Sequence, residues 1–135
     1  MTDHQLTVLI ADDDSDIRRI LSMHLEERPW RLLQARNGAE ALETILVEGP
    51  DLVILDVMMP ELTGWEVLKY LRSKEELRST RVLMLTGIGA TLNEATSPMF
   101  GADAYLDKPF ELDDLDDRLA GLVAGLGADA EPGDA

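Results

Sequence analysis

Three carboxylates follow apolar segments that have the composition of buried β-strands. Asp12 and Asp13 come directly after the run 6–11, and Asp56 comes directly after the run 52–55. In an open sheet of parallel strands, ligands bind at the carboxyl ends of the strands, so these side chains converge if the two strands are neighbours. Carboxylates within a few ångströms repel one another, and they must take up protons or bind a cation. Oxygen-only ligands suit Mg²⁺, Mn²⁺ or Ca²⁺, so the pattern indicates a site for a hard cation.

A hydroxyl and an ammonium group follow two further strand candidates and would reach the same edge of the sheet. Thr86 comes after the run 82–85, and Lys108 follows the run 102–106. The ammonium group could neutralise a phosphoryl group opposite the cation, and the hydroxyl could donate to a phosphate oxygen. A carboxylate nucleophile, a cation, a lysine and a hydroxyl are together the groups needed to form an aspartyl phosphate.

Each of these side chains also has an ordinary structural explanation. An aspartate after a strand commonly caps the next helix, and Asp14 or Ser15 is suited to that role here. Taken alone, Thr86 is a typical strand-end residue and Lys108 is a typical surface lysine. What favours a functional site is the convergence of four different strand ends on one chemistry.

The elements that must position these groups alternate regularly along the chain. The apolar segments with strand character are 6–11, 31–36, 52–55, 82–85 and 102–106. The segments with helical spacing of apolar residues are 14–27, 41–46, 65–71 and the stretch from 112 onward. Such alternation predicts an α/β fold, in which a parallel sheet is covered by helices on both faces. Residues 91–99 are a poor helix candidate because they include Thr, Ser and Pro98, which disfavour a helix.

The composition limits the classes of protein to which the chain can belong. Its 135 residues carry a formal net charge of −15 and include no cysteine. The charge disfavours direct binding to nucleic acid and docking on an anionic membrane. The absence of cysteine excludes disulfides, thiolate nucleophiles and Cys-based zinc sites. The N-terminus lacks a signal-peptide pattern, and the longest uncharged apolar stretch, 119–128, is about half a membrane span, so we expect a cytoplasmic protein.

Six stretches together resemble the receiver domain of bacterial two-component response regulators, over roughly residues 6–126. They are Val8–Arg18, Asn37–Leu42, Pro50–Pro60, Gly64, Met84–Thr86 and Gly101–Phe110. The resemblance implies a flavodoxin-like (βα)5 fold, a doubly wound sheet of five parallel strands in the order 2-1-3-4-5. We expect the receiver domain at residues 1–126 and a disordered acidic tail at residues 127–135.

The resemblance also implies roles for the site residues, with Asp56 as the phosphoacceptor. Asp12 and Asp13 are the acidic pair, of which Asp13 binds Mg²⁺ directly and Asp12 acts largely through water. Mn²⁺ is an alternative ion. The backbone carbonyl of Met58 completes the metal ligands of the protein. Lys108 contacts the phosphoryl group.

A further implication of the resemblance is how the signal leaves the site. The Lys108–Pro109 peptide bond is cis, Thr86 moves toward the phosphoryl group, and Tyr105 turns inward behind it. The added negative charge and acceptor oxygens draw in a nearby hydroxyl and ammonium group. The chain is therefore expected to be a single-domain response regulator, which is a phosphorylation-activated switch and not an enzyme. Such a switch assists its own phosphorylation and dephosphorylation. A histidine kinase or phosphotransfer protein would supply the phosphoryl group, and an unknown downstream protein would receive the signal.

Some positions depart from the usual receiver pattern. The stretch 88–104 contains no Lys or Arg, so a dimer held by complementary charges on that face is not expected. Pro98 falls where the fourth helix should continue. Proline in a helix interior costs about 3 kcal/mol, so we expect that helix to be short, shifted or mobile. Met58 lies two residues after Asp56, and Ile88 lies two residues after Thr86. Apolar side chains at these positions would hinder the water that attacks the phosphoryl group, which predicts a long-lived phosphorylated state.

Two other functions share parts of the pattern. The acidic triplet that begins at Asp12 contains the Asp-x-Asp of haloacid dehalogenase-like phosphatases, in which Asp12 would be the nucleophile. However, Asp16 stands where that motif has Thr or Val. A receiver-like scaffold that is never phosphorylated would keep the fold without any Mg²⁺-dependent modification. An EF-hand loop beginning at Asp12 fails, because its sixth position is Ile17 and not Gly.

Overall fold

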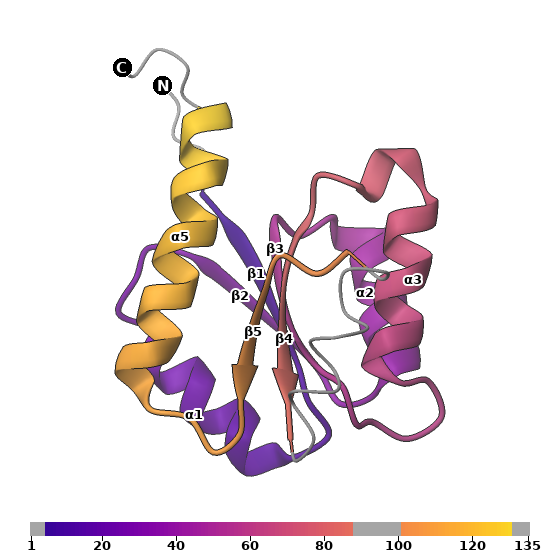
Figure 1. Cartoon of the computed structure of the whole chain (residues 1–135), viewed down its shortest axis with the longest axis horizontal. Coiled ribbons are helices and arrows are strands. Elements are labelled where there is room, and N and C mark those ends of the chain that lie inside the picture. The colour runs from indigo at the N-terminus through magenta and orange to yellow at the C-terminus, as the bar shows by residue number, and fades with distance from the viewer. Residues whose placement is uncertain (1–4, 88–100, 131–135) are drawn as a thin grey trace.

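The computed structural model describes residues 5–87 and 101–130 of the chain (Figure 1). Its strands are β1 (Thr7–Ala11), β2 (Arg31–Ala35), β3 (Leu52–Asp56), β4 (Arg81–Thr86) and β5 (Ala104–Asp107). Its helices are α1 (Ser15–Leu25), α2 (Gly38–Glu48), α3 (Gly64–Ser73), the short 3₁₀ helix η1 (Glu75–Leu77) and α5 (Leu112–Ala130). The strands form one parallel sheet in the order β2-β1-β3-β4-β5, which confirms the predicted fold class and strand order.

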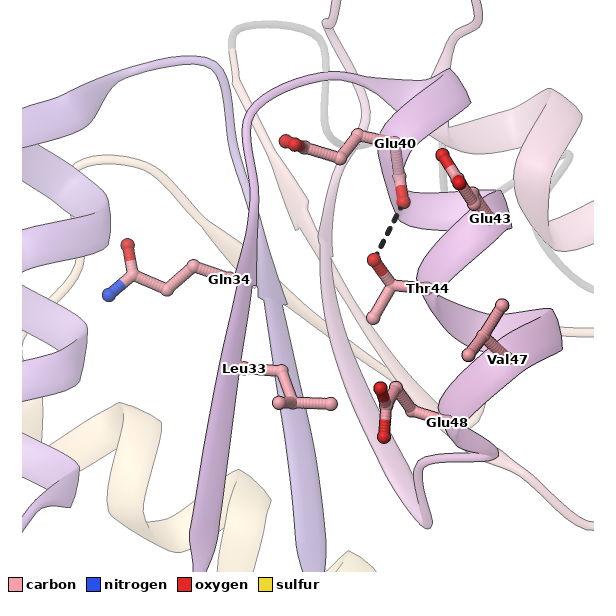
Figure 2. A pocket seen from close by; sticks show the side chains of 7 residues that line it. All are labelled: Leu33, Gln34, Glu40, Glu43, Thr44, Val47 and Glu48. Atoms are coloured by element: carbon pink, nitrogen blue, oxygen red, sulfur yellow. Dashed lines mark hydrogen bonds between the residues drawn. The ribbon is translucent and has the colours of Figure 1, made fainter.

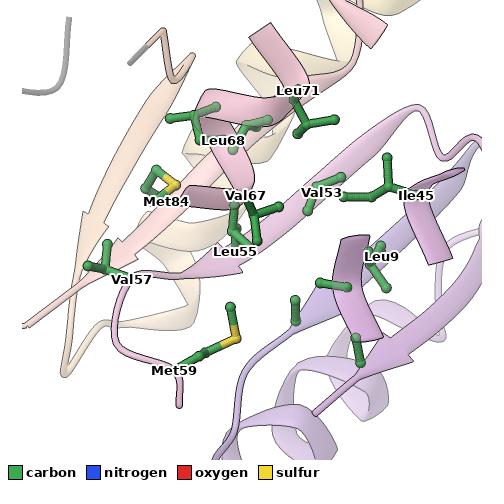
Figure 3. Close-up of a cluster of buried hydrophobic side chains, with 14 of the residues drawn as sticks. Leu9, Ile45, Val53, Leu55, Val57, Met59, Val67, Leu68, Leu71 and Met84 are labelled. Atoms are coloured by element: carbon green, nitrogen blue, oxygen red, sulfur yellow. The ribbon is translucent and has the colours of Figure 1, made fainter. Parts of the chain in front are cut away.

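Helices cover both faces of the sheet, and each face has its own apolar core (Figure 1). On one face, Leu21 and Leu25 of α1 and Leu115 and Leu119 of α5 pack against side chains of the sheet. On the other face, apolar side chains of β1, β3 and β4 pack against α2 and α3 (Figure 3). All of β3 is buried, because this strand lies in the middle of the sheet with helices on both sides.

Side-chain caps mark where three of the helices begin. Asp14 accepts hydrogen bonds from N–H groups in the first turn of α1, and Asn37 does the same for α2. α3 begins with a capping box, in which Thr63 and Glu66 exchange hydrogen bonds. These caps satisfy N–H groups that have no partner within the helix. Of the two candidates for capping α1, Asp14 therefore takes the role.

The parallel register brings the carboxyl ends of the strands to one edge of the sheet. Ala11, at the end of β1, pairs with Leu55 of β3. Thr86, at the end of β4, pairs with Asp107 at the end of β5. Residues that directly follow these strands in the sequence therefore meet at the same end of the molecule.

At the opposite end of the sheet, Arg72 of α3 holds several segments of backbone together. Its guanidinium group donates to the carbonyl oxygens of Gly101 and Thr80, each at 2.8 Å, and pairs with the Asp103 carboxylate at 2.9 Å. The same carboxylate accepts a hydrogen bond from the N–H of Val82, near the start of β4. One side chain thus ties α3 to the residues at the start of β4 and before β5.

The C-terminal helix is longer than the sequence pattern indicates. α5 continues through Ala130, four residues past the boundary at residue 126 that the sequence predicts for the receiver domain. Alanine and leucine, which are frequent in α5, favour continuation of a helix. The predictions for residues 131–135, for Pro98 and Ile88, and for the rest of the stretch 88–100 lie outside the described residues. Within the described ranges, none of the helices has the length and apolar character needed to cross a membrane.

Candidate functional site

Asp56 ends β3 and is almost completely buried, with 4% of its surface exposed. Its Oδ1 lies 3.2 Å from Nζ of Lys108. The backbone of Asp56 packs closely against Gly64. A Cβ atom at Gly64 would overlap the Asp56 carbonyl oxygen. The N–H of Gly64 also donates to the carbonyl oxygen of Val57 at 2.9 Å. A glycine at the start of α3 is therefore needed for the close approach that supports the Asp56 backbone.

Asp12 follows β1 and is fixed through both its backbone and its side chain. Its N–H donates to the carbonyl of Ala35 at 3.2 Å, and its own carbonyl accepts a hydrogen bond from Nη1 of Arg18 at 2.8 Å. Its Oδ1 accepts from the N–H of Asp14 at 2.9 Å, and its Oδ2 lies 2.9 Å from Nζ of Lys108. Because Asp12 is fully buried, the lysine supplies the opposite charge that a buried carboxylate requires.

The acidic side chains converge as expected from the strand ends. Asp12, Asp13 and Asp56 each offer a carboxylate oxygen, and these atoms all lie within 4.8 Å of one another. Asp12 and Asp56 are buried, whereas Asp13 is exposed. A cavity of about 470 Å³ lies beside the cluster and is lined by Asp13, Asp14, Asp56, Met58, Gly87 and Lys108. A small ligand entering this cavity can reach the Asp56 carboxylate.

Lys108 pairs with two carboxylates, those of Asp12 and Asp56, and the excess of negative charge around it shifts pKa values in the site. Burial, together with the negative charge of Asp12, raises the pKa of Asp56 from 3.8 to about 7, although Lys108 acts in the opposite direction. Burial also acts to lower the pKa of Lys108, but the hydrogen bond to Asp12 and the charges of both carboxylates outweigh it, and the pKa is raised. An oxygen-only donor set with excess negative charge fits a hard divalent cation such as Mg²⁺.

Thr86 ends β4 and is almost completely buried, with 1% of its surface exposed. Its hydroxyl donates to Oδ1 of Asp107 at 2.6 Å, and its carbonyl accepts a hydrogen bond from the N–H of Lys108 at 2.6 Å. The ring of Tyr105 packs against the core on the α2 and α3 face. The Tyr105 hydroxyl oxygen is buried and has no hydrogen-bond partner within residues 5–87 and 101–130.

Other site residues show what the sequence pattern reveals and what it misses. The Lys108–Pro109 bond is cis, as the resemblance implies, and Met58 lines the same cavity as Asp56. The pattern does not single out Arg18, which reads as an ordinary polar residue of a helix. It also does not single out Asp107, although a carboxylate at the end of a strand, directly before a site lysine, is a signal that could have been used.

A second hollow, of about 390 Å³, lies between β2 and α2 (Figure 2). Several of its polar side chains form hydrogen bonds or ion pairs that hold this edge of the molecule together. Glu40 accepts a hydrogen bond from the N–H of Arg36 at 2.6 Å, and Glu48 pairs with Arg31 at 2.8 Å. Gln34 points away from α2 toward α1 (Figure 2), where it donates to Ser22. The convergent carboxylates and lysine lie instead at the carboxyl ends of the strands.

The family model for the response regulator receiver domain matches residues 8–120. The chain belongs to this family. Among curated relatives of this receiver domain, "Probable transcriptional regulator ycf27" of Cyanophora paradoxa is 38% identical over 116 residues, which are 86% of this chain and 47% of that protein. "Transcriptional regulatory protein TrcR" of Mycobacterium tuberculosis is 34% identical over 118 residues, which are 87% of this chain and 45% of that protein. The chain thus spans about half the length of these relatives.

Solved receiver structures share the fold. The receiver domain of the Francisella response regulator 1452 has a TM-score of 0.79 and 36% identity, covering 87% of this chain and 96% of that one. The chemotaxis response regulator CheY4 of Vibrio cholerae has a TM-score of 0.81 and 31% identity, covering 88% of this chain and 99% of that one. The family match confirms the resemblance inferred from the motifs and places the chain among the signalling switches of two-component systems.

Proposed function

We propose that this receiver domain is switched by phosphorylation of Asp56. The observation that carries the proposal is the position of the Asp56 carboxylate, 3.2 Å from Nζ of Lys108 and in the wall of an open cavity. Asp12 belongs to the same cluster but is fully buried and does not line that cavity. Asp56 is therefore the buried acid that a phosphoryl donor can reach.

The transfer requires an ionised Asp56 carboxylate. One of its oxygens forms a bond to phosphorus while the bond from phosphorus to the donor, the imidazole nitrogen of a phosphohistidine, breaks and leaves its electron pair on the nitrogen. Mg²⁺, with Mn²⁺ as an alternative, would reduce the negative charge that the reacting groups present to one another. Its proposed ligands are Asp56, Asp13, the backbone carbonyl of Met58 and, largely through water, Asp12. Lys108 pairs with a phosphoryl oxygen and compensates the added charge.

We propose that the signal leaves the site through Thr86 and Tyr105. The Thr86 hydroxyl turns to a phosphoryl oxygen, because that group becomes a charged acceptor close to the end of β4. Tyr105, whose ring already packs inward against the core, fills the space that Thr86 vacates. The resulting change of surface alters the affinity of the receiver for a protein partner.

The proposed donor is a histidine kinase or a phosphotransfer protein, and the proposed recipient of the signal is another protein. A net charge of −15 disfavours binding to nucleic acid, so direct DNA binding is not expected of the receiver domain, which we place at residues 1–126. α5 continues past this boundary to Ala130.

The receiver assists its own phosphorylation and dephosphorylation and does not act as an enzyme on a separate substrate. Its proposed location is the cytoplasm.

The test is incubation with acetyl phosphate and Mg²⁺, followed by intact-mass measurement of the wild type and the Asp56→Asn variant. One phosphoryl group on the wild type alone, abolished by EDTA, would support the proposal. Asp117→Asn, which removes an exposed carboxylate of α5, is the matched control and should be modified like the wild type. Modification of both the wild type and Asp56→Asn would indicate Asp12 as the nucleophile. If the wild type is not modified and also does not bind Mg²⁺, the chain is an unphosphorylated scaffold.

A further inference from the structure

The hydrogen bond between Thr86 and Asp107 is short, and it plays no part in the proposed phosphoryl transfer. The two residues are paired in the register of β4 and β5, and Oγ1 of Thr86 lies 2.6 Å from Oδ1 of Asp107. The side chain of Thr86 is buried, so water competes poorly for its hydroxyl. A hydroxyl has one proton to donate, and in this structure the Asp107 carboxylate accepts it.

Thr86 has an acidic strand end on each side. β4 lies between β3, which ends at Asp56, and β5, which ends at Asp107. The backbone of Thr86 is held by the hydrogen bond from the N–H of Lys108 to its carbonyl oxygen. A change of acceptor therefore requires a rotation of the Thr86 side chain, and a β-branched side chain has few discrete rotamers. The hydroxyl thus has one bound arrangement in the present structure and must leave it to reach a phosphoryl group.

We infer that Asp107 is a positioning residue, which holds the Thr86 hydroxyl away from the phosphorylation site and stabilises the unswitched receiver. The inference rests on the proposed function and deepens it. Hydrogen bonds to an ionised acceptor are shorter and stronger than those to a neutral one. A phosphoryl group on Asp56 must therefore compete with a carboxylate, and not with water, for the same proton.

Binding of beryllofluoride in the presence of Mg²⁺, a stable mimic of the phosphoryl group, measures this competition. The apparent Kd is inversely proportional to the fraction of molecules in which the Thr86 hydroxyl is free to bind the mimic. Asp107→Val removes the acceptor at an exposed strand end and should lower the apparent Kd roughly tenfold, the size expected for one hydrogen bond to a charged group. Asp107→Asn keeps a neutral oxygen acceptor and should give a smaller decrease. Asp117→Asn removes an exposed carboxylate elsewhere and should leave the Kd unchanged.

A double-mutant cycle distinguishes positioning from charge repulsion. If Asp107 acts through the Thr86 hydroxyl, Asp107→Val has no effect in a Thr86→Val background. If its charge merely repels the bound anion, the decrease persists in that background, and Asp107→Asn equals Asp107→Val; either result overturns the inference. Equal affinity of the wild type and both Asp107 variants also overturns it while leaving the proposed function intact. Failure of the wild type to bind the mimic overturns both.

Discussion

The raised pKa of Asp56 predicts that Asp56→Asn stabilises the metal-free protein, and does so increasingly as the pH rises. The pKa of this carboxyl is about 7 in the folded chain against an ordinary value of 3.8, because of burial and the charge of Asp12. The folded state therefore holds this proton more tightly than the unfolded state. The contribution of the group to stability is complete below about pH 4 and is lost as the pH rises through about 7.

The interval between these pKa values corresponds to about 4 kcal/mol, at roughly 1.4 kcal/mol per pH unit. Asp56 is nearly fully buried, so solvent screening does not remove this penalty. An asparagine at this position cannot ionise, and the difference in free energy of unfolding between Asp56→Asn and the wild type should grow by several kcal/mol from pH 4 to pH 8.

Urea denaturation at a series of pH values, with EDTA present, measures this difference. Asp117→Asn is the control for loss of an exposed carboxylate and should follow the wild type at every pH. Added Mg²⁺ should narrow the difference at pH 8, since it stabilises the ionised carboxylate of the wild type alone. A difference that does not change with pH, or an Asp56→Asn variant that is less stable than the wild type at pH 8, would refute the reasoning.

Four further substitutions test other parts of the structure. Gly64→Ala should destabilise the protein in urea by roughly 3 kcal/mol or more, because its Cβ overlaps the Asp56 carbonyl oxygen. Gly121→Ala has open space and should stabilise α5 by up to about 1 kcal/mol. Arg72→Lys should lower the free energy of unfolding by roughly 2–3 kcal/mol, because an ammonium group cannot reproduce the fork of hydrogen bonds. Met58→Asn should shorten the lifetime of the phosphorylated protein several-fold, measured by intact mass after removal of acetyl phosphate; a wild-type half-life of seconds would count against shielding by this residue.

Most of the site follows from the sequence because parallel strands bring their carboxyl ends together. Apolar runs such as β3 mark the central strands, and the residues directly after them must then be neighbours. The relative burial of Asp12 and Asp13 is not predictable in this way, since adjacent aspartates have the same chemistry. The structure separates them by placing Asp12 beside Lys108 and leaving Asp13 exposed.

The residues that the sequence pattern missed act through contacts that depend on register and rotamer. Asp107 contacts Thr86 because β4 and β5 pair in a particular register, which the composition of either strand does not specify. Arg18 reaches the carbonyl of Asp12 from α1, and its spacing alone gives no sign of that. The extension of α5 to Ala130 shows a related limit, because small residues that suggest a tail also continue a helix.

The balance of charge at the carboxylate cluster also has a consequence for encounter with phosphoryl donors. Lys108 pairs with two of the three carboxylates of the cluster, those of Asp12 and Asp56, and the whole chain carries a net charge of −15. A small anionic donor therefore diffuses toward the cavity against a repulsive field, which dissolved salt screens over about 10 Å at 0.1 M. Higher ionic strength should accelerate capture of such a donor. A protein donor with basic groups around its phosphohistidine would instead be attracted, and salt would slow its association. The local field thus favours a phosphoryl group that is delivered from a basic protein surface over one that is free in solution.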